Sequence, residues 1–149
     1  MTEVCLVGNE DVDLRNELLG RETSREALLT YELRRPWRNT IAMSTVSLGA
    51  AVSLLNDLNW YLTRFTRDAM VRDPSISEED WLSRRLAQEI RGERIDPTEV
   101  GEWFKVYGVV KGNLVDPMYL QGAGGDLPTY DLREVDETVR CRITRREFG

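Results

Sequence analysis

The chain has 149 residues, of which 41% are hydrophobic and 31% are charged, and its formal net charge is −6. This balance is ordinary for one globular domain, so the composition excludes a disordered chain. A negative net charge repels phosphate backbones, so nucleic-acid binding would need a local basic patch. We expect one domain over residues 1–149 in the cytoplasm, because no signal sequence opens the chain and no apolar run is long enough to cross a membrane.

The sequence contains no histidine. This absence excludes Ser-His-Asp hydrolases, Cys-His proteases and His-ligated zinc or iron sites. Cys5 and Cys141 are far apart and form no Cys-x-x-Cys motif, so they predict neither a metal site nor a redox pair within one chain. We interpret both as buried apolar residues, since free cysteine is one of the most buried residue types. The sequence predicts no catalytic residue, no metal and no cofactor, and it favours a protein that is not an enzyme.

The first part of the chain predicts three short strands and one helix. Residues 4–7 form an apolar strand, and Asp11 is placed to cap a helix that Gly20 closes in the left-handed region. Residues 29–34 alternate between apolar and polar side chains and predict a second strand. Residues 40–46 predict a third strand, antiparallel to the second because the connection between them is short.

The middle of the chain predicts two helices. In residues 47–72 apolar side chains recur at spacings of three and four, which predicts one long helix. Residues 73–74 are Asp-Pro and end this helix. Ser77 and the acids after it form a capping pattern for a second helix, which Gly92 ends. We expect residues 96–99 to form one further helical turn.

The last part of the chain predicts a hairpin and a final strand. Residues 104–110 and 114–120 flank a glycine-containing turn, and the glycine-rich run 121–126 predicts a mobile loop. Residues 138–144 predict a strand whose apolar side chains face the core and whose arginines face outward. The complete order predicts an α+β domain with a mainly antiparallel sheet and helices packed on one face. A ferredoxin-like core with an extra helix and C-terminal strands is one arrangement that this order allows.

Five segments spread over most of the chain carry a family resemblance. They are Val4-Cys5-Leu6-Val7-Gly8, Leu33-Arg34-Arg35-Pro36, Ser47-Leu48-Gly49-Ala50-Ala51 with Leu55-Asn56-Asp57-Leu58-Asn59-Trp60-Tyr61, and Val106-Tyr107-Gly108-Val109-Val110. Together they resemble an uncharacterised protein family of haloarchaea. The resemblance implies a domain of unknown function from a salt-rich archaeal cytoplasm, and it supplies no catalytic residues.

One candidate site is an arginine-rich surface. Its candidate nucleic-acid-binding residues are Arg34, Arg35, Trp37, Arg38, Arg140 and Arg142, with Arg145 and Arg146 beside them in the sequence. The tryptophan could stack on a nucleobase while the arginines contact phosphates. If the two arginine groups lie on neighbouring sheet surface, the patch overcomes the net negative charge at close range. The alternative is a solvated face whose arginines pair with nearby acids.

A second candidate site lies on the polar side of the predicted long helix. Its candidate ligand-binding residues are Asn56, Asn59, Trp60, Thr63 and Arg67. Their amide, indole and guanidinium groups suit a carboxylate or a nucleobase, but none is a good general base near neutral pH. The alternative is a helix surface that contacts a loop or another subunit.

These features favour a cytoplasmic binding or regulatory module that acts through protein contacts, with a protein partner or further copies of itself. Two alternatives stay open. The first is a small-molecule-binding protein or histidine-free enzyme that uses the polar row, and the second is a nucleic-acid-binding protein that uses the arginine-rich surface. Nucleic acid is the less favoured partner, and no membrane contact is expected.

Overall fold

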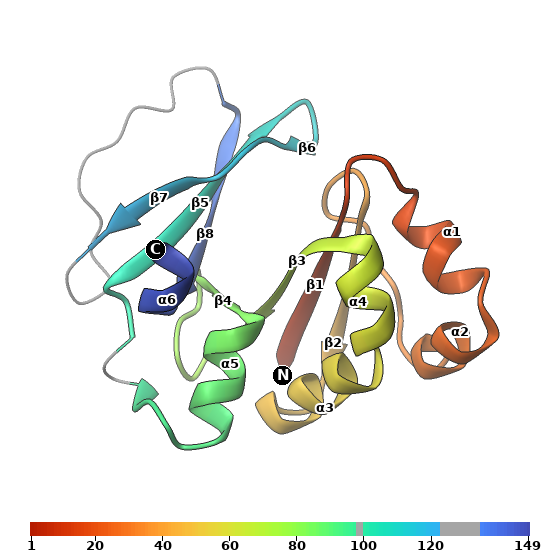
Figure 1. Cartoon of the computed structure of the whole chain (residues 1–149), viewed down its shortest axis with the longest axis horizontal. Coiled ribbons are helices and arrows are strands. Elements are labelled where there is room, and N and C mark those ends of the chain that lie inside the picture. The colour runs from red at the N-terminus through yellow and green to blue at the C-terminus, as the bar shows by residue number, and fades with distance from the viewer. Residues whose placement is uncertain (98–99, 123–134) are drawn as a thin grey trace.

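The polypeptide is organised around one curled sheet (Figure 1). The computed structural model describes residues 1–97, 100–122 and 135–149. The strands are β1 (Thr2–Gly8), β2 (Thr40–Thr45), β3 (Thr66–Arg72), β4 (Trp81–Ser83), β5 (Trp103–Val110), β6 (Asn113–Leu114), β7 (Met118–Gln121) and β8 (Glu137–Ile143). The helices are α1 (Leu14–Leu19), α2 (Glu22–Leu28), α3 (Leu48–Asp57), α4 (Asn59–Phe65), α5 (Arg84–Arg91) and α6 (Arg145–Phe148).

The strand order of the sheet is β2-β1-β3-β4-β8-β5-β6, and β7 also pairs with β5. Every described pairing is antiparallel except that of β4 with β8, which is parallel. The short strand β4 joins two wings, one made of β1, β2 and β3 and the other of β5 to β8 (Figure 1). The mixed α/β architecture and the mainly antiparallel sheet therefore confirm the predicted class. The ferredoxin-like core is not confirmed.

Two clusters of apolar side chains lie on opposite faces of the first wing. On one face, alternate residues of its strands, such as Val4, Ile41 and Val71, pack beneath helices α1 to α5. On the other face, residues such as Cys5 and Met70 pack against side chains from β4 and from β5 and β8 of the second wing. The helices thus cover one face, as the sequence predicts. The curl buries the other face, which explains why residues 4–7 of β1 are apolar without alternation.

The predicted helix over residues 47–72 is broken after Asp57 and is wrong for residues 66–72. Helix α3 ends at Asp57, α4 begins at Asn59, and the chain then enters strand β3 at Thr66. Ala69 and Val71 face the helices while Met70 faces the second wing, so β3 is buried on both faces. Three consecutive apolar residues, 69–71, fit a buried strand as well as a helix, and pairing within the sheet decides between them.

Two other predicted elements are also corrected. Residues 29–34 form no strand, because the chain leaves α2 in a turn with Leu29 75% exposed, and only Arg34 makes an isolated bridge to Ala42. Strand β2 instead pairs with β1. The second predicted helix begins at Arg84 and not near Ser77, because residues 81–83 form strand β4, which joins the two wings.

Smaller differences concern the helix ends. Asp13, and not Asp11, caps α1, and Gly20 has a right-handed φ of −81°. Gly92 does follow the end of α5 as predicted.

The hairpin of β5 with β6 and β7 and the last strand β8 are confirmed, with the return arm of the hairpin interrupted around Pro117. Part of the predicted turn (residues 98–99) and most of the glycine-rich run (residues 123–126) lie outside the described residues.

In the part of the chain that the structure describes, no helix combines the length and the hydrophobicity that crossing a membrane requires.

Candidate ligand-binding site

A cleft of about 940 Å³ lies between helix α5 and the pair α3–α4. Helix α5 runs antiparallel to α3, since Arg91 at its end lies against Gly49 while Arg84 at its start contacts Asn56. The first residues of β3 and the side chain of Glu147 from α6 complete the lining. The cleft is polar, and the arginines that line it are Arg67, Arg84, Arg85, Arg91 and Arg94.

Arg84 spans the cleft. Its Nη1 atom donates to Asn59 Oδ1 at 2.8 Å, and its Nη2 atom donates to Asn56 Oδ1 at 3.3 Å and to the Leu55 carbonyl oxygen at 3.2 Å. A guanidinium group can only donate, so both amides must turn their oxygen atoms toward it. Their Nδ2 groups are left as donors for a ligand.

Two guanidinium nitrogens of the cleft arginines are buried without a partner. Among the described residues, Arg84 Nε and Arg67 Nη2 are inaccessible to solvent and donate to no acceptor within the protein. Burial also lowers the pKa of Arg84, which reflects the cost of removing its charge from water. An unsatisfied buried donor costs about 1–3 kcal/mol and more when charged, so an acceptor from outside the chain would stabilise both groups.

Arg67 reaches the cleft from an irregularity in the sheet. The register between β1 and β3 shifts at Val7/Gly8, where Thr66 pairs with Gly8 and Asp68 pairs with Val7. Arg67 is therefore the extra residue of a β-bulge, a feature that re-aims a side chain and occurs often beside binding sites. Its guanidinium lies 5.2 Å from the ring centre of Tyr107, and Nη1 lies 3.6 Å from carboxylate oxygens of Glu10 and Asp116.

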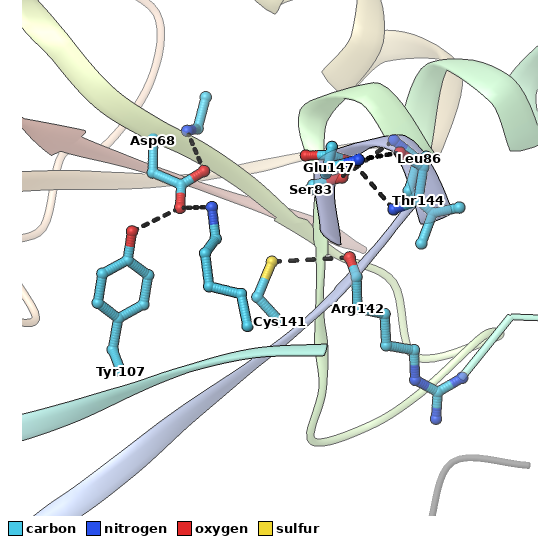
Figure 2. Close-up of polar contacts among 10 residues, drawn as sticks. Asp68, Ser83, Leu86, Tyr107, Cys141, Arg142, Thr144 and Glu147 are labelled. Carbon is cyan, nitrogen blue, oxygen red and sulfur yellow. Dashed lines mark hydrogen bonds and ion pairs between the residues drawn. The ribbon is translucent and has the colours of Figure 1, made fainter. Parts of the chain in front are cut away.

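The carboxylates that line the cleft are all engaged by protein groups. Asp68 lies between the two wings of the sheet, where it accepts from Lys105 Nζ at 2.5 Å and from the Tyr107 hydroxyl at 2.7 Å (Figure 2). Its side chain is 8% exposed and that of Lys105 is 11% exposed. Burial works against the Lys105 charge, yet the Asp68 carboxylate raises the pKa of Lys105. Burial and the same carboxylate raise the pKa of Tyr107, so its phenol stays protonated.

Glu147 and Glu89 are also paired. Glu147 accepts from the Ser83 hydroxyl at 2.6 Å and from the Thr144 backbone N–H at 3.0 Å (Figure 2). The same Ser83 oxygen accepts from the Leu86 N–H and so caps α5. Glu89 lies 3.9 Å from Arg85. The positive charge of Arg67, Arg84 and their neighbours is therefore only partly balanced within the cleft.

Four of the five residues of the predicted polar row line this cleft. Asn56, Asn59, Thr63 and Arg67 are among its lining residues, although they belong to α3, α4 and β3 and not to one helix. Trp60 is not among them. Its side chain is 49% exposed, and the Arg64 guanidinium stacks 3.8 Å from its ring centre.

The sequence reasoning missed Arg84. The capping pattern at Ser77 predicts a helix that begins there, so Arg84 and Arg85 fall inside the predicted helix and give no signal of a site. They occupy the first turn of α5, where the positive end of the helix dipole favours acids over cations. Two arginines directly after a capping serine would have indicated an anion site.

The predicted arginine-rich surface is only partly assembled. Arg34, Arg35 and Trp37 line a hollow of about 320 Å³, and Trp37 also borders an adjoining hollow of about 350 Å³ with Arg140. Acids engage most of these groups, since Arg34 lies 3.4 Å from a Glu3 oxygen and the Trp37 indole donates to Glu137 at 3.0 Å. The Arg38 backbone N–H donates to the Gly112 carbonyl oxygen, and its side chain is exposed.

The expected outward orientation is wrong for Arg142. Its side chain is 13% exposed and donates to the buried carboxylate of Asp80 at 2.9 Å. Arg140 is held by the same carboxylate, with its Nε 3.0 Å from Asp80 Oδ1. One buried acid thus draws both arginines inward, an arrangement that residue alternation along β8 does not reveal.

The thiols of Cys5 and Cys141 are both buried and unreactive. Burial raises the pKa of Cys5 to about 12 and raises that of Cys141 well above its usual value, so neither forms a nucleophilic thiolate near neutral pH. Their predicted burial is confirmed. Within the described ranges, no group of three or more cysteine and acidic side chains is placed to hold a metal ion.

Comparison with known proteins identifies a family without an assigned activity. Residues 2–109 match DUF5804, a family of unknown function. The chain belongs to this family. The match covers the cleft residues of α3, α4, β3 and α5 but ends before β8 and Glu147. No curated protein and no solved structure matches the chain. The expected family of unknown function is thereby confirmed, while its haloarchaeal source stays a prediction.

Proposed function

We propose that this member of DUF5804 binds a small molecule through an oxyanion group, a phosphate or a carboxylate, in the cleft between α5 and α3–α4. The observation that carries the proposal is the pair of buried, unpartnered guanidinium nitrogens, Arg84 Nε and Arg67 Nη2, on residues that line one cleft. An oxyanion accepts several charge-assisted hydrogen bonds at once and would satisfy both donors.

The neighbouring groups support the same ligand class. The Nδ2 atoms of Asn56 and Asn59 add neutral donors, because Arg84 occupies the oxygens of both amides. The cleft carboxylates are neutralised or capped by other protein groups, so they do not repel an anion as strongly as free acids would. The free amide donors and the engaged carboxylates favour the small-molecule alternative over a module that acts only through protein contacts. Protein contacts and nucleic-acid binding both stay predictions.

Calorimetric titration with inorganic phosphate tests the proposal. We expect saturable binding by the native chain and a concentration-dependent rise in melting temperature, since a ligand that binds only the folded state stabilises it. Arg84→Lys keeps the charge but removes the planar fork of donors, so it should weaken phosphate binding.

Arg64→Gln is the matched control. Arg64 lies on the exposed side of α4 and stacks on Trp60, outside the cleft, so this variant should bind phosphate as the native chain does. The proposal is wrong if the native chain shows no saturable binding, or if Arg64→Gln and Arg84→Lys weaken it equally.

A further inference from the structure

The cleft carries positive charge at both ends of helix α5. Arg84 is the first residue of the helix and Arg91 is the last, and both line the cleft. Seven residues correspond to almost two helical turns and to about 10 Å along the axis, so the two arginines lie on the same face. Gln88, one turn after Arg84, lies between them and donates to Asn56 Oδ1 at 3.4 Å.

The far end of the cleft is unpaired. Across the described residues, the side chains of Arg91 and Arg94 make no hydrogen bond or ion pair. Arg91 lies across the first turn of α3, since a Cβ atom on Gly49 would come within 2.8 Å of Arg91 Nε. The Arg91 guanidinium thus lies close to the backbone at the start of α3, where helix N–H groups also favour an anion. Glu89, the carboxylate on the same stretch of α5, lies 3.9 Å from Arg85.

The volume of the cleft also exceeds what one small anion needs. At about 940 Å³ it lies in the upper part of the range of small-molecule and cofactor sites. A single phosphate between Arg67 and Arg84 would leave the stretch toward Arg91 and Arg94 empty. A longer molecule would fill this stretch and place a second anionic group beside the unpaired guanidiniums.

We infer that the ligand of the proposed site is an elongated molecule with two oxyanion groups about 10 Å apart, one held by Arg67 and Arg84 and the other by Arg91 and Arg94. This inference rests on the proposed function and adds the spacing and the number of anionic groups. Linking two anionic groups makes the second contact intramolecular, so affinity rises only if the spacer matches the distance between the two arginine pairs.

Calorimetry of the full chain with three probes tests the inference: inorganic phosphate, pyrophosphate and hexane-1,6-bisphosphonate. Hexane-1,6-bisphosphonate should bind at least about tenfold more tightly than phosphate, since one more charge-assisted contact contributes that much or more. Pyrophosphate carries two linked groups but is too short to reach both arginine pairs, so it should lack most of this gain. Arg91→Gln, a change on an exposed side chain, should remove most of the bisphosphonate gain and weaken phosphate binding much less than Arg84→Lys does.

The outcomes separate the two proposals. If phosphate binds but the bisphosphonate binds no more tightly, or if Arg91→Gln keeps the gain, the two-anion inference is wrong and the single-anion site stands. If neither phosphate nor hexane-1,6-bisphosphonate binds, both proposals are wrong. A bisphosphonate gain that Arg64→Gln also removes would show that the gain does not come from the cleft, and it would overturn the inference.

Discussion

Replacement of Asn59 by aspartate separates the two roles that the structure gives to this side chain. Its Oδ1 atom accepts from Arg84 at 2.8 Å, and its Nδ2 group is left for the ligand. Asn59→Asp keeps an oxygen facing Arg84 and turns the available donor into a second, charged oxygen. The change is nearly isosteric, so steric effects should be small.

The two effects have opposite signs. Pairing Arg84 with a carboxylate at an exposed position should raise the free energy of unfolding by about 0.2–1 kcal/mol. Binding loses a donor to an anion, which contributes about 1.5–3 kcal/mol, and gains a like-charge repulsion. Since 1.4 kcal/mol corresponds to tenfold in affinity, we expect phosphate to bind at least about tenfold more weakly.

Urea unfolding and calorimetric titration measure the two quantities separately. Asn16→Asp, on the exposed side of α1, is the matched control because it adds the same charge away from the cleft. It should leave phosphate affinity nearly unchanged. The account of the cleft is refuted if Asn59→Asp binds phosphate as tightly as the native chain, or if Asn16→Asp weakens binding to the same extent.

Three further predictions concern the charged groups that hold the sheet together. Tyr107→Phe removes a hydrogen bond to the Asp68 carboxylate and should lower the free energy of unfolding by about 1.5–3 kcal/mol in urea titrations, whereas an unchanged midpoint would contradict the assigned bond. Lys105→Met leaves the Asp68 charge buried without its cation and should cost about 3–5 kcal/mol, a larger loss than that of Tyr107→Phe. Burial opposes the charge of Glu3, yet hydrogen bonding and the charge of Arg72 lower its pKa below 4.5. Its contribution to stability is therefore present above the unfolded pKa and lost as the pH falls through the lower folded pKa. Unfolding measured across the acidic range should show less pH dependence in Glu3→Gln than in the native chain, and identical profiles would contradict this assignment.

The sequence predicts elements whose signal is local. The strand at residues 4–7, the hairpin around Gly112 and the last strand each combine an apolar pattern with a turn or a boundary residue, and all are present. The helix end at Gly92 is likewise set by local backbone preferences. For the candidate site, helical spacing places Asn56 near Asn59, and this holds even though the helix breaks between them at Leu58.

What the sequence does not predict depends on long-range pairing. Met70 and its neighbours become a strand because β1 and β4 provide partners on both sides, and no feature of residues 66–72 alone decides this. Arg84 reaches Asn59, 25 residues earlier in the chain, only because α5 packs against α3. Long-range pairing also turns Arg140 and Arg142 inward. The parallel pairing of β4 with β8 brings the buried Asp80 next to both arginines.

The most direct test of an oxyanion site is the nuclear magnetic resonance signal of the Arg84 Nε–H group during titration with inorganic phosphate. This group is buried without a partner, so a bound oxyanion should shift its proton resonance downfield and slow its exchange with water. Arg84→Lys removes the signal and so assigns it. The account predicts a saturable shift of this resonance with the same affinity that calorimetry gives, while the Arg64 signal stays in place. A stationary Arg84 signal at saturating phosphate would contradict it.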